Sequence, residues 1–197
     1  MVMPALRKRH WTVADVRALI DETRHWPRYE LLEGELLVTP APVPRHQLAV
    51  SELLLLVGTY CKREGIGIAL TSPADIELAP ESIMQPDLFV VPDATFPEGE
   101  ALEWPQVKEL LLAVEVLSSS SIRQDRITKR EFYLANHVDE YWIVDLDARI
   151  FERWTPERST PDLRRDDVTW LPRGAVAPLV IDVQEFFQKR VRLPRRI

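Results

Sequence analysis

Two short stretches decide the fold, Gln85-Pro86-Asp87-Leu88-Phe89-Val90-Val91 and Leu111-Leu112-Ala113-Val114-Glu115-Val116-Leu117. Each contains an apolar run typical of a buried strand, and each carries one carboxylate. An ionised acid in a protein core costs several kcal/mol or more unless it is paired. Two acids in adjacent core strands therefore imply a shared partner, most simply a cation. Asp87 and Glu115 are candidate ligands of a divalent metal ion.

The bulk composition is typical of a single globular domain. The chain has 197 residues, of which 46% are hydrophobic and 28% are charged, and this length suits one domain with a sizeable core. No apolar run approaches the roughly 20 residues that span a bilayer, and the N-terminus lacks a signal-peptide pattern. The single cysteine, Cys61, allows neither an internal disulfide nor a cysteine-based zinc site. We therefore expect a cytoplasmic protein.

The net charge limits the ways in which the protein could bind nucleic acid. The formal charge is −6 at pH 7. This value argues against non-specific coating of nucleic acid, whose affinity comes mainly from neutralisation of phosphates by Lys and Arg. A local basic cleft remains compatible with it.

The N-terminal half of the sequence alternates between helical and strand-like patterns. Thr12 and Asp15 resemble a variant capping box that opens a short helix, which we expect to end before Pro27. Residues 29–38 have the pattern of a β-hairpin with Gly34 in its turn. Further along, the apolar spacing predicts one long helix and two strands, over residues 46–61, 68–70 and 75–78.

The C-terminal half begins with the two acid-bearing strands, which a loop over residues 92–107 connects. Four serines, 118–121, follow the Glu115 strand, and one of them can cap a helix. Beyond this helix the pattern predicts a hairpin of strands 140–145 and 150–154, a loop over 156–167, a short edge strand over 168–171 and a terminal helix over 182–189.

Asp125 and Lys129 lie four residues apart on the helix that follows the Glu115 strand, and thus on one face of it. Hydrolysis of a phosphodiester needs a metal to organise water and phosphate, and a cation to neutralise the developing charge. Lys129 could supply that cation by pointing back over Glu115. The alternative is an ordinary exposed ion pair worth roughly 0.3–0.5 kcal/mol.

Several ordered motifs together resemble the Uma family of restriction endonucleases, a family placed in the P-D…(D/E)-x-K nuclease superfamily. The resemblance covers about residues 26–187 and implies a restriction-endonuclease-like α/β fold, in which helices flank a central mixed β-sheet. It also implies cleavage of DNA with Mg²⁺, or with Mn²⁺, as cofactor. The motifs are Tyr29-Glu30-Leu31-Leu32-Glu33-Gly34-Glu35, Arg45-His46, Gln85-Pro86-Asp87, Val114-Glu115-Val116-Leu117-Ser118, Asp125 with Lys129 and Tyr133, and Glu140-Tyr141-Trp142-Ile143-Val144-Asp145.

The resemblance assigns roles to individual residues. Asp87 matches the acid of the P-D motif and would be a metal ligand, and Glu115 would be the second. The peptide carbonyl of Val116 would be a third. The superfamily's usual lysine lies two residues after the glutamate, where this sequence has Leu117. As in the family, Lys129 is the natural substitute.

The resemblance implies less defined roles for three other residues. Asp125 would orient Lys129, Glu35 would be an extra acid beside the metal, and His46 would contact phosphate or shuttle a proton. His46 could equally be a helix cap or a packing residue. The sequence departs from the family's Pro in the serine-rich turn, and it has His137 where the family commonly has a Gly. The second departure puts in doubt a tight turn with positive φ.

We expect an N-terminal helical extension over residues 1–25, the nuclease-like domain over 26–188 and a basic tail over 189–197. Many nucleases of this fold pair two subunits, so a homodimer is expected. A basic tail is solvated by default, although it could touch a DNA backbone. The alternative function is a catalytically inactive nuclease fold that binds nucleic acid or a protein partner. The acidic net charge and the displaced lysine favour this alternative slightly.

Overall fold

Six strands form one central sheet in the order β3-β4-β5-β6-β7-β8. The computed structural model of the protein describes residues 10–23, 26–95 and 103–191. Strands β5 and β6 run parallel and the other neighbouring pairs antiparallel, so the sheet is mixed. The predicted α/β class is confirmed. The strands are β3 Gly67–Thr71, β4 Leu88–Pro92, β5 Leu112–Val116, β6 Tyr141–Asp145, β7 Ile150–Trp154 and β8 Asp162–Arg164.

The two acid-bearing stretches are neighbours in this sheet. β4 and β5 pair antiparallel with Leu88 opposite Val114. Asp87 immediately precedes β4, and Glu115 follows Val114 in β5. The register therefore brings both acids to the same end of the sheet.

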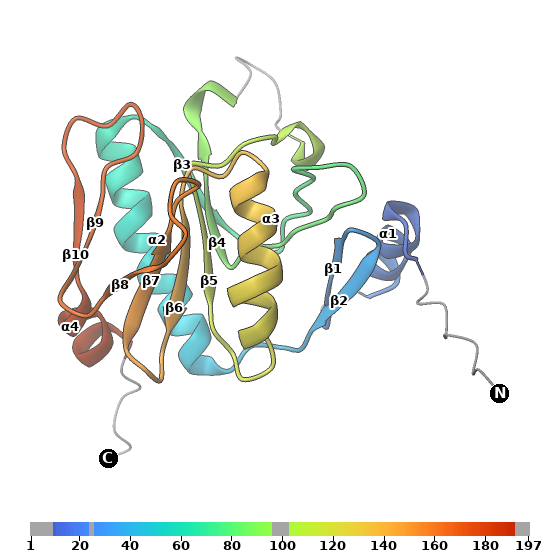
Figure 1. Cartoon of the computed structure of the whole chain (residues 1–197), viewed down its shortest axis with the longest axis horizontal. Helices are drawn as coiled ribbons and strands as arrows, with labels where there is room; N and C mark the ends of the chain where they lie inside the picture. Colours follow the sequence, from blue (N-terminus) through green and yellow to red (C-terminus); the bar gives the residue numbers. More distant parts are fainter. Residues whose placement is uncertain (1–9, 24–25, 96–102, 192–197) are drawn as a thin grey trace.

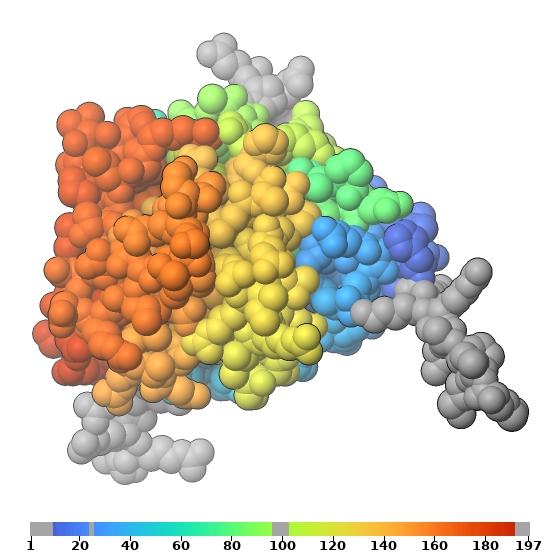
Figure 2. Space-filling view, in the orientation of Figure 1, coloured from blue at the N-terminus to red at the C-terminus, as the bar shows by residue number. Residues whose placement is uncertain are grey.

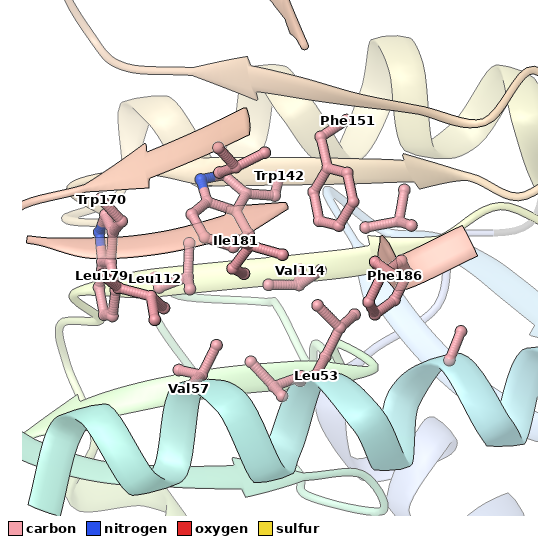
Figure 3. Packing of buried hydrophobic residues seen from close by; sticks show 14 of the residues in the cluster. Leu53, Val57, Leu112, Val114, Trp142, Phe151, Trp170, Leu179, Ile181 and Phe186 are labelled. Carbon is pink, nitrogen blue, oxygen red and sulfur yellow. The ribbon is translucent and has the colours of Figure 1, made fainter. Parts of the chain in front are cut away.

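Helix α2 (Pro44–Glu64) covers one face of the sheet. Pro44 suits the first turn, where its missing N–H costs no hydrogen bond, and Gly65 ends the helix with a φ of 66°. The apolar stripe of α2 points at the sheet, and Figure 3 shows Leu53 and Val57 facing Val114 of β5. This packing fixes the position of the α2 N-terminus beside the acid-bearing end of β5.

A C-terminal hairpin and helix complete the same face. Trp142 of β6 packs against Trp170 with ring centroids 6.0 Å apart, and Phe151 packs against Phe186 at 5.3 Å. Asp182 caps the helix by accepting a hydrogen bond from the N–H of Glu185. The elements are β9 Asp167–Trp170, β10 Leu179–Asp182, α4 Val183–Glu185 and the π-helical turn η4 Phe186–Arg190.

The opposite face carries the connection between β5 and β6. This connection is helical, with a π-helical part η3 (Gln124–Lys129) that continues into α3 (Arg130–Ala135). Phe132 and Tyr133 bury it against the sheet. Figure 1 shows α3 and α2 on opposite sides of the sheet, so the fold has three layers.

The N-terminal elements lie beside the α3 layer, outside the central sheet. They are α1 (Val13–Glu22), which Thr12 opens through a capping box with Asp15, and the hairpin of β1 (Arg28–Leu32) and β2 (Glu35–Thr39). Val16 of α1, Leu31 of β1 and Ile83 form a small core of their own. Figure 2 shows this N-terminal unit, in blue, against the yellow segment that contains α3. Two short 3₁₀ turns, η1 (Asp93–Thr95) and η2 (Trp104–Gln106), complete the described elements.

Two predictions about where strands lie were wrong. Residues 75–78 form no strand, since only Ile76 makes a bridge, to Met84, and prolines at 73 and 80 restrict the backbone there. The predicted loop 156–167 contains strand β8. The short edge strand predicted over residues 168–171 is confirmed as β9, which pairs with β10 in a hairpin separate from the central sheet.

His137 adopts the positive φ that the family's glycine would supply, with a value of 58°. The tight turn therefore survives the departure from the family pattern. Residues 96–102 of the predicted loop and residues 192–197 of the predicted basic tail lie outside the described part of the chain. None of the described helices is long and apolar enough to cross a membrane.

Candidate active site

A cavity of about 310 Å³ opens at the end of the sheet where the two acid-bearing strands meet. Its floor contains Asp87, Glu115, Asp125 and Lys129. Its walls are the segment that enters α2, residues 39–46, and the serine-rich turn, residues 118–121. Residues from the sheet, from η3 and from α2 thus converge on one space.

Lys129 is the centre of the buried charges. Its Nζ lies 2.8 Å from Oε2 of Glu30, 2.9 Å from Oε1 of Glu115 and 3.7 Å from Oδ1 of Asp125. Its relative exposure is 4%. The helix that follows β5 therefore carries Lys129 back over Glu115. The hydroxyl of Tyr133, one turn further along, donates to the same oxygen of Glu115 at 3.3 Å.

Both oxygens of Asp87 accept hydrogen bonds. Arg28 Nη2 donates to Oδ1 at 2.7 Å. His46 Nε2 and the backbone N–H of Val116 both donate to Oδ2 at 2.9 Å. The bond to Val116 ties the start of β4 to the end of β5. The second ring nitrogen of His46, Nδ1, is buried without a hydrogen-bond partner among the described residues.

These contacts shift the pKa values of the buried groups in opposite directions. Burial alone would raise the pKa of Asp87, but His46 and Arg28 outweigh burial and hold the pKa well below its usual range. Burial would lower the pKa of Lys129, but the surrounding carboxylates raise it. Burial raises the pKa of Glu115 well above its usual value, which Lys129 offsets only in part. For Asp125, burial raises the pKa to about 6.

The cluster has too little positive charge for its acids. Four buried carboxylates, those of Glu30, Asp87, Glu115 and Asp125, contact or adjoin two permanently charged cations, Arg28 and Lys129. With all four carboxylates ionised, these six groups have a net charge of −2. Burial is the main cause of the raised pKa values of Glu115 and Asp125, and the neighbouring carboxylates of the cluster raise them further.

The sequence of a known family matches most of the chain. The model of a family described as "Uma2: Putative restriction endonuclease" matches residues 13–184. This protein belongs to the Uma2 family. The resemblance noted from the sequence motifs is thereby confirmed.

A solved structure shares the fold of this Uma2 protein. It is a crystal structure from Anabaena variabilis described as a putative nuclease belonging to DUF820, with a TM-score of 0.67 and 18% sequence identity. The match covers 82% of this chain and 90% of the other. No protein with a curated description matches the chain. The descriptions of the family and of the solved structure both name a nuclease.

The fit of a metal ion to this Uma2 site rests on charge and ligand chemistry. The two oxygens of Asp125 are buried without a hydrogen bond of normal geometry from any described residue, and the cluster has four carboxylates for the two cations Arg28 and Lys129. Carboxylate and carbonyl oxygens are the ligands that Mg²⁺ prefers. In the described parts of the chain, no three His, Cys, Asp or Glu side chains are close enough together to coordinate a metal ion. Arg28 and Lys129 lie between the acids and keep them apart.

The structure brings most of the candidate residues together and separates one. Asp87, Glu115, Val116, Asp125, Lys129 and His46 all line the cavity. Glu35 is exposed at the start of β2 and is not among the residues that line it.

Sequence analysis missed Glu30 and Arg28. Glu30 lies in the same hairpin as Glu35, but its side chain is buried, and its Oε1 accepts the N–H of Gln85 at 2.8 Å. The sequence does contain a signal for Glu30, because this acid directly precedes two apolar residues. An acid beside apolar residues of a strand is also the pattern that singled out Glu115. The role of Arg28 depends on the tertiary contact with Asp87, which no local pattern reveals.

Proposed function

We propose that this Uma2 protein is a metal-dependent endonuclease that hydrolyses phosphodiester bonds of DNA. The observation that carries the proposal is the contact of the buried Lys129 amine with Glu115, in a cavity that Asp87 shares. An acid pair beside a lysine is the arrangement that hydrolysis of a phosphodiester requires. The family and the shared fold support the same function.

Asp87, Glu115 and the carbonyl of Val116 are the groups that would hold the metal ion. A bound Mg²⁺ or Mn²⁺ would act as a Lewis acid that activates water and neutralises phosphate charge. Arg28 occupies Oδ1 of Asp87 in this structure, so the ion and the guanidinium compete for this oxygen. A released guanidinium at that position could bind a phosphate oxygen, for which its planar fork is well suited.

Lys129 and its neighbours prepare the site for an anionic substrate. The raised pKa of Lys129 keeps the amine charged at neutral pH, so it can neutralise charge on the scissile phosphate. Glu30 and Asp125 hold the amine in place from two sides. His46 is fixed through Asp87, and its partnerless Nδ1 can accept or donate one proton within the site.

One observation favours a second function. Both oxygens of Asp87 accept hydrogen bonds from protein donors, namely Arg28, His46 and the N–H of Val116, and these donors already satisfy the carboxylate. An inactive nuclease fold that only binds nucleic acid or a protein partner would also have this arrangement.

The two functions are separated by plasmid nicking with Mg²⁺ or Mn²⁺, with EDTA as the blank. Glu115→Gln replaces a buried acid by an amide of similar size and should fold, and Lys129→Arg keeps the charge but changes its position. Both variants should lose at least 100-fold in rate, on the scale of other electrostatic catalytic groups. The matched control, Glu131→Gln, alters an exposed acid of α3 and should cut at the wild-type rate. Absence of cleavage by the folded wild type on duplex, single-stranded and RNA substrates would leave the binding function.

A further inference from the structure

A second cavity of about 260 Å³ adjoins the candidate active site. The two cavities have four residues in common, Arg28, Pro42, His46 and Asp87. These residues form the wall between the two cavities. One side of this wall faces the acids and the lysine of the active site. The other side faces a space between the N-terminal unit, the start of α2 and the end of β3. A ligand held in one cavity therefore lies directly beside a ligand held in the other.

The lining of the second cavity suits a flat aromatic ring with polar edges. Trp26 is 39% exposed, and the Arg28 guanidinium lies over its ring, with Cζ 5.2 Å from the ring centroid. Pro42 and Pro73 add apolar surface. Gln47, Thr71 and Ser72 supply side-chain donors and acceptors along the remaining edge. The cavity is smaller than the roughly 300–1,000 Å³ that drug-sized ligands occupy, so a single ring system fits better than a longer segment.

We infer that this cavity, the base pocket, binds an unpaired nucleobase next to the scissile phosphate. The inference rests on the proposed function, which places a phosphate at Lys129 and Asp87. The two cavities share Arg28, Pro42, His46 and Asp87, so a nucleotide attached to that phosphate can extend past Arg28 and His46 into the second cavity. Its base then reaches Trp26, on which bases of any identity can stack.

The base pocket determines the class of substrate. A base within a duplex can enter it only after leaving the stack, which costs a few kcal/mol and is cheapest for an unpaired base. Three described cations around the active site, Arg28, Arg45 and Lys129, all pair with acids, so they are not free to bind the phosphates of a duplex. Single-stranded segments, or unpaired bases within a duplex, are therefore the preferred substrates.

The test measures binding in EDTA, so that it does not depend on cleavage. A fluorescein-labelled single-stranded oligonucleotide and a fully paired hairpin of similar length are titrated with protein, and anisotropy gives Kd. The single strand should bind at least tenfold more tightly than the hairpin. Trp26→Ala should weaken binding of the single strand by about tenfold, within the range for loss of one base stack. Trp26→Phe, which retains an aromatic face, should lose much less.

Two controls keep the result specific. Leu55→Ala removes a side chain of α2 that is 62% exposed and lines neither cavity, and it should bind like the wild type. Circular dichroism should show that Trp26→Ala is folded, since Trp26 contributes little to the core. Equal affinity of Trp26→Ala and the wild type for the single strand would overturn the inference, as would tighter binding of the paired hairpin.

The outcome can be separated from that of the proposed function. One outcome is metal-dependent cleavage that requires Glu115, is equal for paired and unpaired substrates and is unaffected by Trp26→Ala. This outcome would support the proposed nuclease function and reject the base pocket. Binding of the single strand that depends on Trp26, without cleavage under any metal, would retain the base pocket and remove the catalytic function.

Discussion

The Lys129 amine and the Glu30 carboxylate lie 2.8 Å apart, although one belongs to the helix behind β5 and the other to a hairpin outside the central sheet. Both side chains are buried, and Glu30 is only 1% exposed. The same amine contacts Glu115 of the sheet. Lys129 therefore joins the N-terminal unit, the helical layer and the sheet at a single point.

Loss of the Lys129 charge should destabilise the protein strongly. Lys129→Met would leave Glu30, Glu115 and Asp125 without their common cation, and breaking a buried ion pair from one side typically costs about 3–5 kcal/mol. Urea unfolding at pH 7 measures the change. Lys62→Met, on an exposed part of α2, should change stability by no more than about 0.5 kcal/mol. Adding Glu30→Gln to Lys129→Met should restore part of the loss, and failure to do so would show that the two residues are not coupled.

The Asp125 carboxyl should make stability depend on pH. Its pKa is about 6 in the folded protein and about 3.9 in an unfolded chain. Between these values the folded state binds more protons, so stability falls as pH rises from about 4 to about 6. Asp125→Asn lacks this fall and should be more stable than the wild type at pH 7, by about 1–2 kcal/mol.

Thermal unfolding of the wild type and of Asp125→Asn at pH 4, 5, 6 and 7 measures this difference in stability. The two proteins should converge as the pH falls toward 4, where the Asp125 carboxyl is protonated in the folded state and about half protonated in the unfolded state. Asp147→Asn, at an exposed acid, should track the wild type at every pH. A constant difference between Asp125→Asn and wild type across the range would contradict the assignment of the raised pKa to Asp125.

Replacement of Arg28 should strengthen metal binding. Arg28→Gln frees Oδ1 of Asp87 and removes a positive charge a few ångströms from the metal ligands, a change worth more than ~1 kcal/mol in a protein interior. Calorimetric titration with Mn²⁺ should show about tenfold tighter binding. Arg45→Gln, which breaks a more exposed pair with Asp147, is the matched control. Weaker binding by Arg28→Gln would mean that the guanidinium does not compete with a metal.

The sequence predicted the residues of the candidate site better than it predicted the strands at the edge of the sheet. Asp87 and Glu115 were visible because a charge inside an apolar strand is costly, and Lys129 was visible through its four-residue spacing from Asp125. Strand β8 was missed because an edge strand of Asp162, Leu163 and Arg164 buries little and so has no apolar alternation. The bond between His46 and Asp87 joins distant elements and has no local signature. The hairpin acid that enters the cluster is Glu30, whereas the motif-based choice was Glu35.

The turn at His137 offers a test of backbone strain. A non-glycine residue with a φ of 58° is held in the left-handed region, which costs about 1 kcal/mol. His137→Gly should therefore stabilise the protein by about 0.5–1 kcal/mol in urea unfolding, since the exposed side chain adds little packing. Ala135→Gly, two residues earlier within α3, should instead destabilise it by up to about 1 kcal/mol. A loss of stability in both variants would show that the His137 side chain outweighs the strain.

The position of Glu30 early in the chain has a consequence for synthesis on the ribosome. Glu30 leaves the exit tunnel well before Lys129, because translation proceeds from the N-terminus. Until Lys129 emerges, an acid destined for the interior has no cation to meet and remains hydrated. The N-terminal hairpin can therefore dock only after the helix behind β5 has been made. The cavity also needs Leu146 and Asp147, which are made later still, so a chain that stops short of these residues never acquires it.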